Sequence, residues 1–208
     1  PVAGIATFVN AFAVSGGTPA NSFAAYVDWV KAKNGGKDAV GIPAPASTPE
    51  FLVKVIADKY KLDLVSAPYR GSAPMVTDML GNQIHAGVGS VQDFIENHRA
   101  GKIRVVGVLG TERQAALPDV PTFDEIGLKG FEDLPYYGIY APKGTPAAEI
   151  KRLSDGVAKV LALPEVRTQL VALGLTVDYM TGEQLATREH AYTRAWTRII
   201  KTRGFQPQ

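Results

Sequence analysis

The chain has 208 residues, of which 46% are hydrophobic, so it can bury a sizeable core as one large domain or as two small lobes. Its 22 basic and 20 acidic residues leave a net charge of +2, which gives no concentrated field and makes nucleic acid a poor candidate partner. The absence of cysteine excludes disulfides, thiolate catalysis and cysteine metal sites. No apolar run reaches the roughly 20 residues that cross a bilayer, and the first residues show no export signal.

The first half of the chain has the pattern of alternating strands and helices. Val2 to Val14 is apolar and uncharged, as a segment buried on both faces would be. Buried strands are expected at 39–42, 64–67, 84–88 and 103–108, and helices are expected to begin near residues 22, 48, 72 and 91. In the second of these helices Thr48 is the expected N-cap and Pro49 the first helical residue. This alternation predicts parallel strands joined by right-handed crossovers.

The second half begins with a loop at 118–132 that is expected to hold a short helix at 122–127. A strand at 136–141 should return toward the first segment. Helices should follow from about 145 and 164, then a strand at 175–179 and a last helix capped by Thr181.

Three turns that directly follow predicted strands carry small or hydroxyl residues. In an open parallel sheet these turns lie together at the carboxyl ends of the strands, where ligands bind. Main-chain amides, hydroxyls and the positive ends of helices can hold a carboxylate there without a cation. Simple helix capping explains any one hydroxyl equally well, and an ordinary strand–helix unit explains the turn at 68–72. The predicted carboxylate-binding residues are Ser47, Thr48, Tyr69, Gly71, Ser72, Gly89 and Ser90.

Enzymatic chemistry has little support in the sequence. The segment Gly87–Val91 approaches a nucleophile elbow, but Gln92 stands where that pattern requires glycine. His85, His98 and His190 are expected in surface or capping roles. No ligand spacing indicates a metal site, and no glycine-rich phosphate loop is present. We therefore expect no enzyme activity, no metal and no cofactor.

Several short segments carry a family resemblance. Tyr-Arg-Gly-Ser-Ala-Pro at 69–74, Asp-Met-Leu-Gly at 78–81 and Pro-Asp-Val-Pro-Thr-Phe-Asp-Glu-Ile-Gly-Leu at 118–128 resemble the substrate-binding proteins of tripartite tricarboxylate transporters, called Bug proteins. The segments 101–104 and 141–146 fall where that family has similar ones. The resemblance implies an α/β protein with the two-lobed, type II-like periplasmic-binding fold and mainly parallel sheets.

The same resemblance implies a function. A Bug protein captures a small organic carboxylate in the periplasm and delivers it to a membrane permease, after an export signal has been removed. Two alternatives remain open from the residues alone: a ligand sensor that docks on a membrane receptor, and a small hydrolase or isomerase that acts on a carboxylate.

The resemblance also divides the chain into lobes. Residues 16–133 correspond to a complete second lobe, and 1–15 with 134–208 to a partial first lobe. Family members carry a further N-terminal segment with a glycine-rich loop, and nothing in this sequence matches it. We expect either a preceding segment outside this numbering or a homo-oligomer that covers the open sheet edge.

The turn before residue 48 departs from the family. Pro43, Pro45, Ser47 and Phe51 stand where the family has a serine, two glycines and a histidine. Two prolines remove amide donors, so the sequence predicts a more apolar ligand, such as an aromatic or branched monocarboxylate. Asn82 likewise replaces a glycine of the family pattern.

Overall fold

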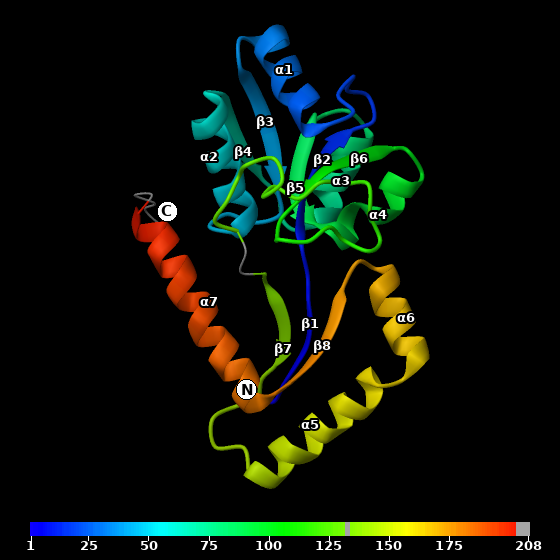
Figure 1. Cartoon of the computed structure of the whole chain (residues 1–208), viewed down its shortest axis with the longest axis vertical. Helices are drawn as coiled ribbons and strands as arrows, with labels where there is room; N and C mark the ends of the chain where they lie inside the picture. Colours follow the sequence, from blue (N-terminus) through cyan, green and yellow to red (C-terminus); the bar gives the residue numbers. More distant parts are fainter. Residues whose placement is uncertain (132–133, 203–208) are drawn as a thin grey trace. The chain divides into compact units, whose positions relative to one another are not determined.

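A computed structural model describes residues 1–131 and 134–202, which form two compact units. Among these residues, 1–8 and 134–202 make up the first unit, and 9–131 make up the second (Figure 1). We expected 1–15 in the first unit, and this boundary is wrong. The apolar run breaks at Phe8 and Val9 into strand β1 (Ala3–Thr7) and strand β2 (Asn10–Ser15), which join different sheets. Residues 203–208, expected in the first lobe, lie outside the described residues.

The second unit is built on a five-stranded sheet. Besides β2 it contains β3 (Lys37–Ile42), β4 (Asp63–Pro68), β5 (Ala86–Ser90) and β6 (Ile103–Val108), in the order β4-β3-β5-β2-β6. β3 pairs in parallel with β4 and β5, whereas β2 is antiparallel to β5 and β6. The carboxyl ends of β3, β4, β5 and β6 therefore share one edge of the sheet.

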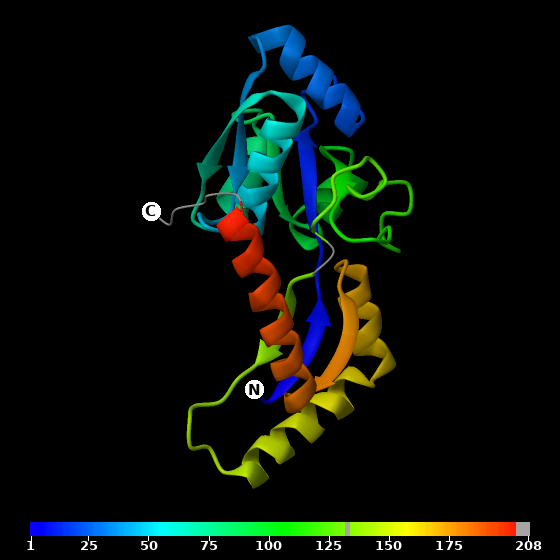
Figure 2. The same cartoon turned by 60° about the vertical axis from the view of Figure 1, so that its left-hand side comes forward.

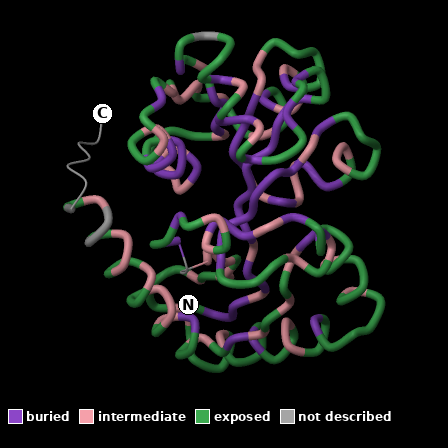
Figure 3. Tube along the Cα trace, turned by 45° about the horizontal axis from the view of Figure 1, so that its top comes forward, coloured by how far each residue is buried: buried purple, intermediate pink, exposed green. Residues whose placement is uncertain are grey.

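Four helices cover this sheet: α1 (Phe23–Asn34), α2 (Thr48–Tyr60), α3 (Ser72–Leu80) and α4 (Val91–Arg99). On one face, the Phe12 ring of β2 contacts Phe23 and Tyr26 of α1 at centroid distances of 5.4 and 5.0 Å. Ala13 and its partner Gly87 point to the opposite face, where α3 packs. All six residues of β2 are buried, and buried backbone runs through the centre of the unit (Figure 3).

Glycines in the strands allow α3 to lie close to the sheet. A Cβ added at Gly41 would come within 2.8 Å of the Met75 side chain, and one at Gly87 within 2.7 Å of the Met79 sulfur. Both methionines are fully buried, so their flexible side chains fill the space that the glycines leave. This contact sets the position of α3, whose first residues lie at the carboxyl edge.

Two local predictions for this unit are wrong. β4 was expected to be a buried strand, but it lies at one edge of the sheet, and Val65 is 61% exposed. The helix expected at 122–127 is a series of turns instead. There the Thr122 hydroxyl accepts a hydrogen bond from the Glu125 amide, and Arg113 holds the Glu125 carboxylate with two nitrogens at 2.9 to 3.1 Å. These side-chain bonds take the place of helical ones.

The first unit has a three-stranded sheet in the order β7-β1-β8, with β7 (Tyr136–Ile139) and β8 (Thr176–Thr181) both antiparallel to β1. The predicted return of the chain to its first segment is thus confirmed, since β7 pairs with β1. Mainly parallel sheets were expected, but this sheet is antiparallel and the five-stranded sheet of the second unit is mixed. The predicted α/β class is confirmed.

Helices cover both faces of this smaller sheet. Helix α7 (Gly182–Thr202) lies on one face, where its Leu185 contacts the Gly138 position of β7. Helices α5 (Ala147–Leu161) and α6 (Pro164–Ala172) lie on the other, and Figure 2 shows α6 beside β8. Among the described helices, none has the combination of length and hydropathy that a membrane span requires.

Candidate functional site

The candidate site lies at the carboxyl edge of the second unit's sheet, where three strand-to-helix turns follow β3, β4 and β5. Parallel pairing brings the ends of these strands together, and main-chain hydrogen bonds join the first two turns. The Tyr69 amide donates to the Ile42 carbonyl at 2.8 Å, and the Gly71 amide donates to the Pro43 carbonyl at 2.9 Å. The predicted residues Ser47, Thr48, Tyr69, Gly71 and Ser72 therefore occupy adjacent turns.

The β3–α2 turn is held by its own polar groups. Ser47 is the N-cap of α2, but its hydroxyl donates to the Ala44 carbonyl at 2.6 Å instead of capping the helix. Thr48, which we expected to be the N-cap, is the first helical residue, and within the described residues its hydroxyl has no hydrogen-bond partner. Glu50 accepts a hydrogen bond from the Ala46 amide at 2.7 Å. This turn consequently offers one unbonded hydroxyl next to a carboxylate of its own.

The β4–α3 turn has the most open helix start of the three. Its N-cap is Gly71, whose φ of 93° and ψ of 176° suit glycine, and Ser72 is the first helical residue. No side chain caps α3, and its first turn contains no acidic residue. A Cβ at Gly71 would meet nothing within 4 Å, so the space around the turn is open. The amides of Ser72 and Ala73 and the Ser72 hydroxyl can donate into it.

Tyr69 braces this turn and is not a free donor. Its hydroxyl donates to the Asp78 carboxylate of α3 at 2.7 Å. Partial burial, followed by this hydrogen bond and the charge of Asp78, raises the pKa of Tyr69 to about 12. The bond ties the end of β4 to α3 and so positions Gly71 and Ser72.

In the β5–α4 turn, the polar groups of Ser90 are hydrogen-bonded to a residue of the same turn. Asp93 accepts hydrogen bonds from the Ser90 amide at 2.8 Å and from the Ser90 hydroxyl at 2.6 Å, in a capping box. Gly89 is buried, because the space that its side chain would occupy is filled by Asp93, Phe94 and Met75. The structure thus places Ser90 at the edge with its hydroxyl engaged, and Gly89 beneath α4.

The three helix starts differ in how well they can stabilise an added negative charge. A helix N-terminus carries a partial positive charge that stabilises an anion by about 0.3 to 1 kcal/mol, or up to about 2 kcal/mol in partly buried sites. At α2 and α4 that position is taken by Glu50 and Asp93. The start of α3 has no such carboxylate, so it is the most favourable of the three for an external anion.

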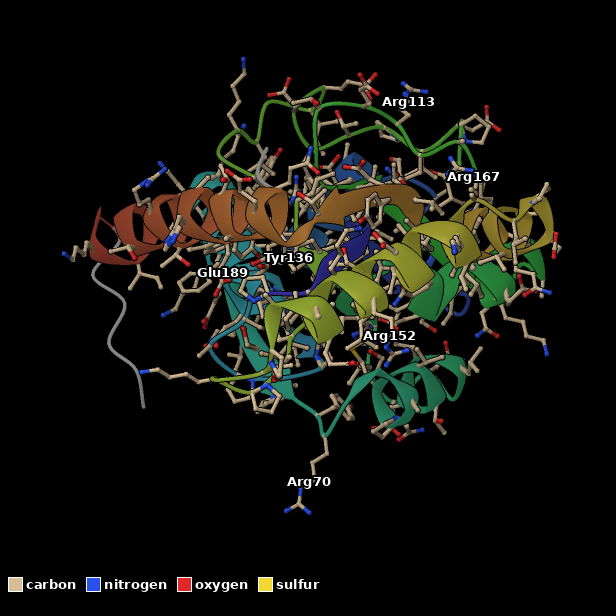
Figure 4. All side chains as sticks on the ribbon, turned by 90° about the horizontal axis from the view of Figure 1, so that it is seen from below. Arg70, Arg113, Tyr136, Arg152, Arg167 and Glu189 are labelled. Carbon is tan, nitrogen blue, oxygen red and sulfur yellow. The ribbon has the colours of Figure 1, made fainter. Side chains whose placement is uncertain are left out.

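Two further polar residues lie at this edge and were not among the predicted site residues. Arg70 is exposed and projects away from the ribbon (Figure 4), and its guanidinium has no partner among the described residues. Asn10 is only 4% exposed and lies directly opposite Ser90 in the strand register. Asn10 could have been noticed in the sequence, because it is a polar residue within the apolar run Val2–Val14.

The histidines of this unit serve other contacts. His85 lies just before β5, and its ring nitrogen is 2.8 Å from the Asp38 carboxylate, which also accepts from the Tyr26 hydroxyl. A ring nitrogen of His98 accepts the Val105 amide at 3.1 Å, and burial, followed by the charge of Arg99, holds its pKa below the ordinary value. Neither histidine is hydrogen-bonded to Ser90, whose hydroxyl donates to Asp93 instead.

The predicted apolar lining of the site is only partly present. Phe51 is 4% exposed, because it belongs to the buried face of α2, so it adds no hydrophobic surface to the turn. Pro45 is exposed and Pro43 is half-buried, so the loss of their amide donors remains. Among the described residues, no group of three histidines and carboxylates is placed to hold a metal ion.

Comparisons with known proteins agree with this fold. A family model described as the tripartite tricarboxylate transporter family receptor matches residues 1–205. A Pseudomonas sp. strain P51 protein, described as the UPF0065 protein in the tcbD-tcbE intergenic region, is 35% identical over 147 residues, which are 70% of this chain and 44% of that protein. The chain spans about half the length of the curated relatives it matches.

Solved structures agree along the whole chain. The periplasmic binding protein BugD has a TM-score of 0.90 and 25% identity, with 100% of this chain and 70% of BugD covered. An R. palustris protein solved with adipate has a TM-score of 0.91 and 25% identity, with coverage of 100% and 69%.

Proposed function

Because this chain belongs to the tripartite tricarboxylate transporter receptor family, we propose that it captures a small organic carboxylate for a membrane permease of that transporter class. In this proposal it acts in the periplasm and binds its ligand reversibly, without catalysing a reaction. The permease is its partner in transport. A homo-oligomer is part of the proposal only if no other polypeptide covers the first unit.

The observation that carries the proposal is the uncapped start of α3. There Ser72, an open Gly71 and the helix dipole meet at the carboxyl edge of a sheet, and no side chain of the turn supplies an anion. An external carboxylate fits this chemistry, because amides and hydroxyls hold it through charge-assisted hydrogen bonds of moderate strength. Thr48 on the adjacent turn adds a second unbonded hydroxyl.

Arg70 and Asn10 extend the proposed site. Arg70 is a cation next to the α3 start and can attract an approaching anion without being buried by it. Asn10 can donate or accept hydrogen bonds from a buried position at the same edge. The engaged hydroxyl of Ser90 is expected to support α4 more than to hold the ligand.

The test is a thermal-shift screen of the whole protein against small carboxylates, followed by calorimetry with the acid that stabilises it most. The panel contains adipate, which a solved relative holds, and aromatic monocarboxylates, which the two prolines of the β3–α2 turn favour. Thr48→Ala and Ser72→Ala should each weaken binding roughly 10- to 150-fold, since a hydrogen bond to a charged group contributes about 1.5 to 3 kcal/mol.

Ser22→Ala is the matched control, because Ser22 also starts a helix and its hydroxyl caps α1, which follows none of the three turns of the site. It should lower stability and leave affinity unchanged. The proposal fails if no acid raises the unfolding temperature, or if all three variants reduce affinity equally.

A further inference from the structure

Asn10 is a buried polar residue whose side chain makes no hydrogen bond within the described part of the chain. It is the first residue of β2 and is only 4% exposed, yet its amide group is not closed off from solvent. A buried amide without a partner costs free energy, and buried polar groups in folded proteins are normally hydrogen-bonded. The amide is therefore suited to a partner that a bound ligand supplies.

The main chain holds Asn10 in place without help from its side chain. Asn10 lies opposite Ser90, the last residue of β5, and its carbonyl accepts a hydrogen bond from the Leu109 amide at 2.8 Å. Asn10 and Phe12 share one face of β2, and the Phe12 ring packs against two rings of α1. The amide is thus presented at the carboxyl edge of the sheet from a rigid strand.

The charge next to Asn10 is negative. Among the described residues of β2, β5 and the first turn of α4, Asp93 is the only charged one. Its carboxylate accepts hydrogen bonds from the amide and hydroxyl of Ser90, the residue that lies opposite Asn10. A carboxylate of a ligand at Asn10 would be repelled by this charge, most strongly where water is partly excluded. A hydroxyl avoids the repulsion and can both donate to and accept from the Asn10 amide.

The separation of the α3 start from Asn10 sets the length of a ligand that reaches both. The Gly71 amide donates to the Pro43 carbonyl, so the α3 start lies beside the end of β3. In the sheet order β5 separates β3 from β2, which amounts to two strand spacings, or about 10 Å. With carbon–carbon bonds of about 1.5 Å, an extended chain of roughly six carbons with an oxygen at each end covers most of this distance.

We propose that the ligand is a monocarboxylate that carries an uncharged hydrogen-bonding group, a hydroxyl above all, at its other end. The carboxylate binds at the start of α3, and the hydroxyl exchanges hydrogen bonds with the Asn10 amide. This inference rests on the proposed function and narrows the substrate class within it. A single carboxylate also agrees with Pro43 and Pro45 of the β3–α2 turn, which offer no amide donors to a second anion.

The test compares two matched triplets of acids by calorimetry with the whole protein. Hexanoate, ω-hydroxyhexanoate and adipate differ only at the distal end, which is a methyl, a hydroxymethyl or a carboxylate group. Dihydrocinnamate and its para-hydroxy and para-carboxy derivatives repeat the comparison on an aromatic frame. In the triplet that binds more tightly, we expect the hydroxy acid to bind about tenfold more tightly than the other two acids, because it alone satisfies the amide without adding a charge.

Equal or tighter binding of the unsubstituted acid or the diacid would overturn the inference and leave the proposed function intact, since a carboxylate would still be bound. The inference is also wrong if neither triplet binds while another acid of the thermal-shift screen does. The absence of binding by every carboxylate in that screen would instead overturn the proposed function, and the inference with it.

Asn10→Leu tests whether the amide is the group responsible, because leucine has a similar size and no polar atoms. The preference for the hydroxy acid should disappear, and the unliganded variant should unfold at the same temperature or higher, since no hydrogen bond of the amide is lost. Thr18→Val is the matched control: Thr18 is 5% exposed beyond the other end of β2, and its hydroxyl donates to the Ser15 carbonyl at 2.8 Å. It should lower stability and keep the preference. A preference that persists in Asn10→Leu would contradict the role of Asn10, and Asn10→Ala repeats the measurement if Asn10→Leu does not fold.

Discussion

Gly71→Ala is the sharpest single test of the proposed anion site. Gly71 is the N-cap of α3 and has a φ of 93° and a ψ of 176°, a region that essentially only glycine adopts. Because a Cβ there would meet nothing within 4 Å, the substitution adds no steric clash. Its whole cost is backbone strain, and the chain can relieve this strain only by rotating the turn that aims the Ser72 and Ala73 amides.

The expected loss of stability is about 1 to 3 kcal/mol, the usual cost of a residue held in such a region. For a chain of this size, 1 kcal/mol lowers the unfolding temperature by roughly 2 to 4 °C. If the turn rotates instead, the Gly71 amide also loses its 2.9 Å bond to the Pro43 carbonyl, and carboxylate affinity falls. Urea unfolding measures the first effect, and calorimetry with the acid found by screening measures the second.

Gly35→Ala is the control for this experiment. Gly35 ends α1 at a φ of 60° and a ψ of 31°, also with nothing within 4 Å of an added Cβ. It should cost about 1 to 2 kcal/mol of stability and leave ligand affinity unchanged. An unchanged unfolding midpoint in Gly71→Ala would contradict the strain argument, and an equal loss of affinity in both variants would contradict the role of the α3 start.

Two further substitutions test contacts away from the site. Hydrogen bonds from the Arg113 guanidinium and then from the Thr122 amide lower the pKa of Glu125 to about 2, so its stabilising effect is present above pH 4.5 and lost as the pH falls toward 2. Glu125→Gln should flatten the decline of unfolding temperature across that range, and an unchanged slope would contradict this account. Asn82→Gly keeps a residue suited to the φ of 54° but removes the side chain that accepts the Gly17 amide at 3.0 Å. We expect urea unfolding to show a loss of about 1 kcal/mol, whereas a gain in stability would mean that the bond contributes nothing.

Local signals in the sequence were sufficient for much of the fold. Alternating apolar runs and turn residues predicted the α/β class and most strands. The start of α1 near residue 22 and the cap of α7 at Thr181 were also predicted correctly. These features depend on contacts between residues that are close in the sequence, so a short stretch of sequence is enough to predict them. The three turns of the candidate site were likewise found, because each follows a strand whose pattern is clear.

The family could also be identified from the sequence alone. Short segments spread from Tyr69 to Pro146 carried the resemblance that the family model then matched over residues 1–205. Such motifs need no tertiary structure to be seen, because side chains required at a turn or a close contact are retained in chain order.

Tertiary structure alone decided which hydroxyls of the three turns are engaged by other side chains. Ser72 and Ser90 look alike in sequence, since each begins a helix after a strand, yet Asp93 engages Ser90 while no side chain engages Ser72. It also decided that the run from Val2 to Val14 serves two sheets, and that β4 is an edge strand. Strand order and side-chain partners arise from contacts between residues far apart in the chain, so they cannot be predicted from the local sequence pattern.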